Sequence, residues 1–112
     1  MLSVDANYNI YLTRGDTGIF TLDLVDDETK EPFTPESGDK IRFAMSKKYG
    51  SKREETLILK DISINDLLIK IDPEDTKNLD FGKYKYDVEY TDASGHVSTV
   101  LLAEFNVTKE VY

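Results

Sequence analysis

Apolar and polar residues alternate with a period of two along most of the chain, a pattern typical of β-strands with one buried and one solvated face. The clearest case is the stretch LDFGKYKYDVEY, residues 79–90. Its apolar side chains fall on one face of the expected strand: Tyr84, Tyr86, Val88 and Tyr90. Its other face is wholly charged: Lys83, Lys85, Asp87 and Glu89. Because such a strand must bury its apolar face to give the domain a core, we interpret the tyrosines as core residues.

The same alternation predicts strands over residues 8–13, 19–25 and 40–47, separated by the turn at 14–18 and a long loop at 26–39. The apolar residues expected to face the core from these strands are Tyr8, Ile10, Leu12, Phe20, Leu22, Leu24, Ile41, Phe43 and Met45. Apolar runs at 56–60 and 67–72 predict two short strands, and residues 96–108 predict one bent strand or two.

One segment has the features of a short helix, expected over about residues 73–79. Asp72 is placed to cap its N-terminus, and Pro73 occupies the first helical position, where its fixed backbone angle is suitable. Acidic residues follow in the first turn, where the positive end of the helix dipole stabilises them. Gly82 then leads into the tyrosine strand.

These elements predict an all-β protein: an immunoglobulin-like antiparallel β-sandwich of about seven or eight strands, with turn signals at the roughly 8–12-residue spacing of such folds. The length of 112 residues fits a single domain, residues 1–112. The terminal segments 1–7 and 110–112 are expected to be less ordered than the rest.

The start of the tyrosine strand has the features of a tyrosine corner, a hydrogen-bonded turn found in immunoglobulin-like sandwiches. In immunoglobulin-like sandwiches, a tyrosine near the start of one strand bonds its hydroxyl back to the preceding connection, two residues before a disulfide cysteine. Tyr84 follows Gly82 at such a place, and Tyr86 occupies the cysteine-like position in a chain that has no cysteine. We therefore expect a backbone partner for the Tyr84 hydroxyl and expect Tyr86 to fill the space between the sheets.

Charge and composition narrow the functional classes. With 22 acidic against 14 basic residues the net charge is -8, so a nucleic-acid partner would be repelled. No apolar run approaches the roughly 20 residues that cross a bilayer, and no signal-peptide pattern follows Met1, so we expect no membrane partner and folding in the cytoplasm of the cell that makes the protein. With His96 as the single histidine, no metal, cofactor or catalytic constellation is expected, and we predict that the protein is not an enzyme.

Two motifs have alternative interpretations. KKYGSKRE, residues 47–54, is the only basic cluster, formed by Lys47, Lys48, Lys52 and Arg53. It is either a solvated loop or a contact for an acidic neighbour, such as the acidic face of another copy. The tripeptide RGD at 14–16 occurs in integrin ligands, but a turn between strands is sufficient to explain it.

Three stretches resemble small structural proteins of phages and prophages of Gram-positive bacteria. They are NIYLTRGDTGIFTLDL, GDKIRFAMSK and DPEDTKNLDFGKYKYDVEYTDASGHVSTV, and the likeness extends to EFNVTKE, so that it covers roughly residues 9–110. The chain is similar to the N-terminal domain of the baseplate upper protein of siphophages. The resemblance implies an immunoglobulin-like sandwich in the virion, partners among other tail and baseplate proteins, and homo-oligomers in the assembled particle. It implies no catalytic or ligand-binding residue.

A carbohydrate-binding or adhesion module is the alternative, because such modules also use β-sandwiches. It would need aromatic side chains that are exposed. The candidates outside the tyrosine stripe of the core are Tyr8, Tyr11, Phe33, Tyr49 and Phe81.

Overall fold

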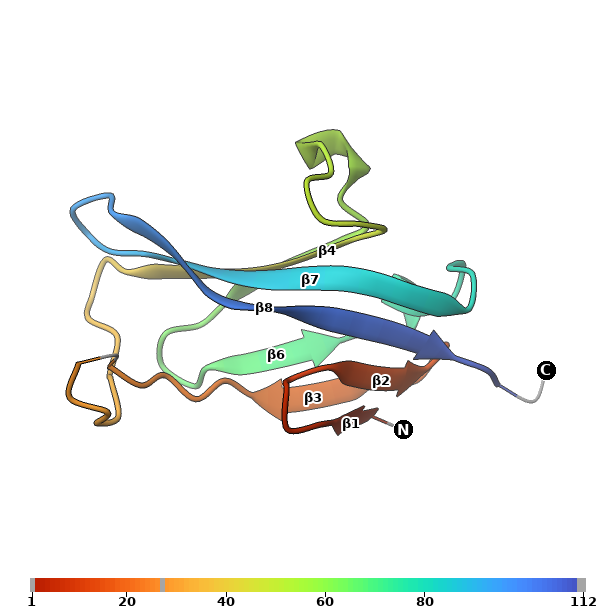
Figure 1. Ribbon diagram of the computed structural model, residues 1–112, viewed down its shortest axis with the longest axis horizontal. Helices are drawn as coiled ribbons and strands as arrows, with labels where there is room; N and C mark the ends of the chain where they lie inside the picture. The colour runs from red at the N-terminus through yellow and green to blue at the C-terminus, as the bar shows by residue number, and fades with distance from the viewer. Residues whose placement is uncertain (1, 27, 111–112) are drawn as a thin grey trace.

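The computed structural model of the protein describes residues 2–26 and 28–110. Within them lie eight strands: β1 Leu2–Val4, β2 Ile10–Thr13, β3 Gly18–Thr21, β4 Lys40–Ser46, β5 Ile58–Ile62, β6 Leu68–Ile71, β7 Gly82–Thr91 and β8 Val97–Thr108 (Figure 1). A 3-10 turn, Arg53–Glu55, follows β4, and a one-turn helix, α1 Pro73–Thr76, follows β6. The prediction of an all-β protein with seven or eight strands and one short helix is confirmed.

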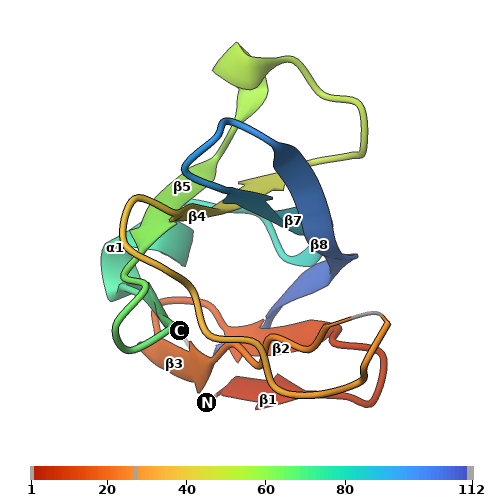
Figure 2. The ribbon, with the colours of Figure 1, turned by 90° about the vertical axis from the view of Figure 1, so that its left-hand side faces the viewer.

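The strands form a curled six-stranded sheet and a small two-stranded sheet. The large sheet has the order β1-β2-β8-β7-β4-β5, and the small sheet pairs β3 with β6. Seen from the end of the molecule, β4, β5 and β7 form one layer, with β1, β2 and β3 across from them (Figure 2). The sandwich-like arrangement therefore encloses the inward faces of both sheets.

One pairing differs from the antiparallel prediction. β2 and β8 are parallel, with Ile10 opposite Phe105 and Thr13 opposite Thr108, whereas the other strand pairs are antiparallel. Alternation shows which face of a strand is buried but not its direction. Only hairpins joined by short turns fix direction locally, and no hairpin joins β2 to β8.

The tyrosine stripe of β7 lies in the core. Tyr84, Tyr86, Val88 and Tyr90 are each at most 8% exposed. They pack with the inward residues of the neighbouring strands, which include Ile10, Leu12, Ile41, Phe43, Met45, Phe105 and Val107. Leu22 is also buried, and Phe20 is half-buried against the same cluster. The expected core residues of β3, β4 and β7 are therefore found in the core.

The N-terminal segment differs from the prediction. Leu2–Val4, expected to be less ordered, pairs with β2 as strand β1. Tyr8, expected to face the core, is 54% exposed and has a positive φ of 65°, because the chain turns there before β2 begins. Asp5 holds this turn by accepting hydrogen bonds from the backbone N–H groups of Asn7 and Asn9. Met1, Val111 and Tyr112, also assigned to less ordered termini, lie outside the described residues.

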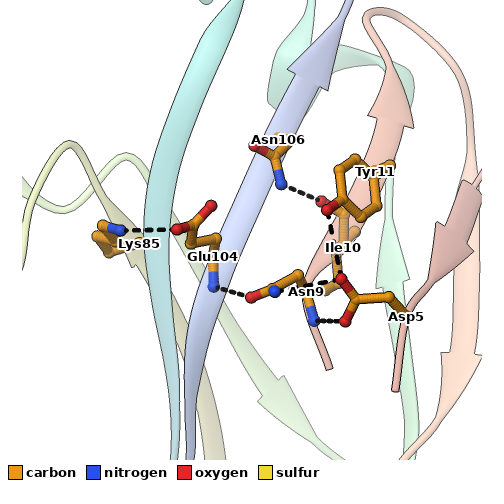
Figure 3. A network of polar contacts seen from close by, with 7 residues as sticks. All are labelled: Asp5, Asn9, Ile10, Tyr11, Lys85, Glu104 and Asn106. Atoms are coloured by element: carbon orange, nitrogen blue, oxygen red, sulfur yellow. Dashed lines mark hydrogen bonds and ion pairs between the residues drawn. The ribbon is translucent and has the colours of Figure 1, made fainter. Parts of the chain in front are cut away.

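Polar side chains also join the start of β2 to β8 (Figure 3). The Asn9 amide donates to Asp5, and its oxygen accepts the backbone N–H of Glu104 at 3.0 Å. The buried Asn106 amide donates to the Ile10 carbonyl oxygen at 3.1 Å. These bonds fix the parallel register without a connecting turn.

The helix is shorter than the predicted residues 73–79. Its hydrogen-bonded turn closes between the Lys77 N–H and the Pro73 carbonyl, and the Leu79 N–H then bonds back to Thr76. Leu79 thereby turns toward the core, where it is partly buried. At the predicted N-terminus, the Asp72 N–H is capped by the Asp75 carboxylate at 2.7 Å. The chain therefore leaves the helical path after one turn, and Leu79 packs against the core beyond it.

The corner before β7 has the expected bond. The Tyr84 hydroxyl donates to the Asp80 carbonyl oxygen at 2.7 Å. Gly82, between them, is exposed with a φ of 139°, which is a conformation that favours glycine. Its role is therefore in the backbone turn and not in core packing.

We expect Tyr84→Phe to lower the free energy of unfolding by about 1 kcal/mol, because the Asp80 carbonyl loses its partner. Chemical denaturation followed by circular dichroism measures the change. Lys85→Ala, on the charged face of the same strand, should stay within about ±0.5 kcal/mol. Equal stability of Tyr84→Phe and the wild type would show that the corner bond contributes nothing.

Candidate interaction surface

A basic arm projects from the large sheet. We use this name for residues 47–57, which connect β4 to β5 and stand away from the body of the molecule (Figures 1 and 2). The four basic residues singled out from the sequence are all exposed on it: Lys47, Lys48, Lys52 and Arg53. The arm is held by local bonds, since the Ser51 hydroxyl donates to the Lys48 carbonyl at 2.6 Å and Glu55 accepts the Lys52 N–H at 2.8 Å.

A groove of about 820 Å³ lies between this arm and the outer face of the large sheet. Lys48, Tyr49 and Arg53 line it from the arm. The sheet contributes charged residues and an apolar set: Arg42, Lys85, Asp87 and Glu89, with Ala44, Leu59 and Leu102, and Leu57 adds apolar surface from the end of the arm. The fold thus brings the predicted basic cluster beside the predicted charged face of β7.

The charges on the groove floor neutralise one another. Arg42 of β4 lies 3.3 Å from Asp87 and 3.1 Å from Glu89 of β7. Lys85 lies 3.3 Å from Glu104 of β8 and also stands over the Tyr49 ring. Each of these paired side chains keeps about a third or less of its surface exposed. The floor therefore has fixed, paired charges, whereas Lys48 and Arg53, which line the groove from the arm, form no ion pair within the described residues.

Part of the apolar lining was not predicted. Leu59 is 61% exposed and lies beside Ala44, which is flanked in turn by Asp87 and then by Leu102 across the sheet. The run TLILK contained a signal for this feature. Three consecutive apolar residues in a strand cannot all face the core, so some of them must be on the outer face.

A second hollow, of about 850 Å³, lies between the loop before β4 and the β7–β8 turn. We call it the acidic basin. Its acidic lining consists of Asp23, Asp26, Glu36, Asp39 and Asp92, and Val25, Phe33 and Val100 supply exposed apolar surface. This surface was not predicted from the sequence, although the acidic residues of the loop are evident there.

Asp39 organises the basin. Its carboxylate accepts hydrogen bonds from the Tyr90 hydroxyl and from the backbone N–H groups of Glu36 and Ala93. The Tyr90 hydroxyl, followed by these N–H groups, holds the pKa of Asp39 below its ordinary value of 3.8. The ionised carboxylate therefore ties the loop before β4 to the β7–β8 turn.

This bond network predicts a pH dependence. A carboxyl whose pKa is lowered by folding stabilises the folded state above its unfolded pKa of about 4, and this contribution is lost as the pH falls through the folded pKa. We expect Asp39→Asn to lower the melting temperature at pH 7 and to make it depend less on pH below about 4. Thermal unfolding between pH 7 and pH 2 measures both effects.

Tyr90→Phe is the matched variant, because it removes the strongest donor and keeps the carboxylate. It should reproduce part of the fall in melting temperature at pH 7 that is expected for Asp39→Asn. An acid dependence of Asp39→Asn identical to that of the wild type would contradict this account.

The remaining candidates from the sequence lie away from the groove, and Arg14 among them has a structural role. Arg14 of the RGD tripeptide pairs with Glu110 at 2.8 Å, donates to the Leu79 carbonyl at 3.1 Å and lies over the Phe81 ring. These contacts hold the turn after β2 against the corner before β7. His96 is exposed in the β7–β8 turn, 3.2 Å from Asp92.

The five candidate aromatic residues are all exposed, but they lie on four separate segments. Tyr8 and Tyr11 are near β2, whereas Phe81 lies at the corner under Arg14. Phe33 packs edge-on against Tyr90 in the acidic basin, and only Tyr49 lines the groove. The fold does not bring the five together as one platform.

No protein-family model matches the chain, and no curated protein matches it either. Over residues 2–26 and 28–110, the acidic residues and His96 form no group of three or more that could hold a metal ion. In the same residues, no helix has the length and apolar character needed to span a membrane. The surface features that remain are therefore the basic arm with its groove and the acidic basin.

Proposed function

We propose that the protein is a non-enzymatic structural component of a phage tail or baseplate and acts by docking onto neighbouring proteins. The resemblance of residues 9–110 to phage structural proteins motivates the assignment to a virion. The observation that carries the docking role is the groove beneath the basic arm. It combines exposed leucines, an aromatic residue and unpaired basic groups around fixed ion pairs.

This combination suits protein–protein contact. Protein interfaces bury apolar side chains at their centre and place charged groups at the rim, where they steer and orient the partner. Leu59 and Leu102 would supply the apolar contact, and Lys48 and Arg53 would meet acidic groups of the neighbour.

The first experiment is to induce a prophage that carries this gene, purify the particles and quantify the protein by mass spectrometry. We expect a fixed stoichiometry that matches the symmetry of a tail or baseplate ring. The double variant Lys48→Glu/Arg53→Glu should be depleted from the particles, whereas Lys77→Glu/Lys109→Glu, with the same change of net charge on other exposed lysines, should be retained. Absence of the wild-type protein from intact particles would refute the proposal.

Carbohydrate binding is the second proposal, and Tyr49 is the observation in its favour. Tyr49 is 48% exposed and lines the groove together with Arg42 and Glu89, while Lys85 stands over its ring. Sugars bind to aromatic side chains in sites that also offer hydrogen-bonding groups. A glycan array probed with the wild type and with Tyr49→Ala tests it. Binding that is lost in Tyr49→Ala would support this function, and an array without any signal would remove it.

A further inference from the structure

The net charge of the protein is concentrated at one end. Residues 23–39 contain seven acidic residues and one lysine, a net charge of -6 out of the total of -8. Asp92 adds another negative charge to the same end, where it lines the acidic basin. The rest of the chain is therefore nearly neutral, although the protein as a whole is strongly acidic.

The basic arm has the opposite character. Its residues 47–53 contain four basic residues and no acidic residue, and Glu54 and Glu55 after them leave the arm a net charge of +2. Lys47 lies over the Tyr84 ring, whereas Lys48, Lys52 and Arg53 form no ion pair with any residue in the described part of the chain. Three exposed cationic groups are therefore available to a partner.

The two charged surfaces do not meet within one molecule. The loop before β4 and the β7–β8 turn lie at one end of the long axis, and the arm projects from the sheet at a distance from them (Figure 1). Within the described residues, no ion pair joins a basic group of the arm to an acidic residue of the basin. Their attraction is therefore realised only when the acidic end of one molecule approaches the arm of another.

The two surfaces also carry exposed apolar side chains. The acidic basin is a hollow of about 850 Å³ with exposed Val25, Phe33 and Val100, and the arm is a narrow projection with exposed Tyr49 and Leu57. Apolar contact can thus accompany the charge pairing. Repulsion between the two net charges is screened beyond about 8 Å at physiological ionic strength, so that the facing surfaces dominate.

We propose that a second copy of this chain docks head to tail, with its acidic basin on the basic arm of the first. This inference rests on the proposed docking role and names the partner of the arm. Each copy keeps one free arm and one free basin, so the contact is heterologous and produces a ring or an open chain of molecules.

Sedimentation of the purified full chain tests the inference. In about 0.15 M salt we expect the mean mass to rise with protein concentration, and in 1 M salt, where the Debye length is about 3 Å, we expect a monomer. Lys48→Glu/Arg53→Glu and Asp23→Lys/Glu36→Lys should each weaken self-association about tenfold or more, because like charges then face each other. Lys77→Glu/Lys109→Glu, with the same net charge as the first variant, should associate like the wild type.

Mixing the two interface variants gives the sharpest result. The first variant keeps the native basin and the second keeps the native arm, so the mixture should associate although neither variant does so alone. A wild type that stays monomeric at all concentrations would overturn the inference, as would association that persists in 1 M salt or in both variants alone. A monomer that is nevertheless present in particles would leave the phage role intact, with a different tail protein on the arm. A self-associating protein that is absent from particles would refute the phage role only.

Discussion

Replacing Phe43 with alanine is expected to lower the free energy of unfolding by about 3–5 kcal/mol, the range for truncating a buried aromatic residue. Phe43 is fully buried at the centre of β4. Its ring stacks on Tyr86 at 5.2 Å and meets Phe105 edge-on at 6.4 Å between centroids. The change would therefore leave a cavity among three adjacent strands and remove two aromatic contacts. Urea denaturation followed by far-ultraviolet circular dichroism measures the loss.

Leu59→Ala is the control for this variant. It also truncates an apolar residue in the large sheet, but Leu59 is on the outer face and is mostly exposed. Its stability should stay within about ±0.5 kcal/mol of the wild type. If both variants lost the same stability, the core would not lie on the inner face of the sheet.

Thr76→Val is expected to lower the free energy of unfolding by about 1–3 kcal/mol, the cost of leaving a buried polar group without a partner. Thr76 is fully buried at the end of α1, and its hydroxyl oxygen accepts the backbone N–H of Gly15 at 2.8 Å. This bond joins the helix to the turn after β2, 61 residues away in the chain. Valine has the same shape but cannot accept the bond.

Thr76→Ser separates the hydrogen bond from the packing. Serine keeps the acceptor and loses only the methyl group, so it should cost less than Thr76→Val. The same denaturation experiment compares the two variants. A serine variant that is less stable than the valine variant would assign the role of Thr76 to packing alone.

Local pattern was sufficient to predict the centre of the fold. Alternation in residues 83–90 depends only on neighbouring residues, and it assigned Tyr84, Tyr86 and Tyr90 correctly to the buried face. The corner bond of Tyr84 was also predictable, because its partner lies four residues away in the chain. The same reasoning failed at Tyr8, where the alternation continues into a turn that Asp5 stabilises.

The features of the fold that alternation did not predict depend on contacts between segments that are distant in the chain. The parallel pairing of β2 with β8 is fixed by Asn9 and Asn106, whose partners are about 95 residues away. The groove likewise combines Arg42, Tyr49 and Asp87 from two strands and the arm. The basic cluster itself was evident from sequence, but its neighbours and its separation from the acidic basin are products of the fold.

The position of β8 has a consequence for biosynthesis. β8 lies between β2 and β7 in the large sheet, although it is made after the other seven strands. Until it leaves the ribosome, β1 and β2 have no sheet to join and β7 lacks one of its two neighbours. We therefore expect the large sheet to be completed only after residue 108 has emerged, and this completion to be slow because it pairs distant parts of the chain. During translation, the half-made sheet would expose apolar strand surface that a chaperone can bind.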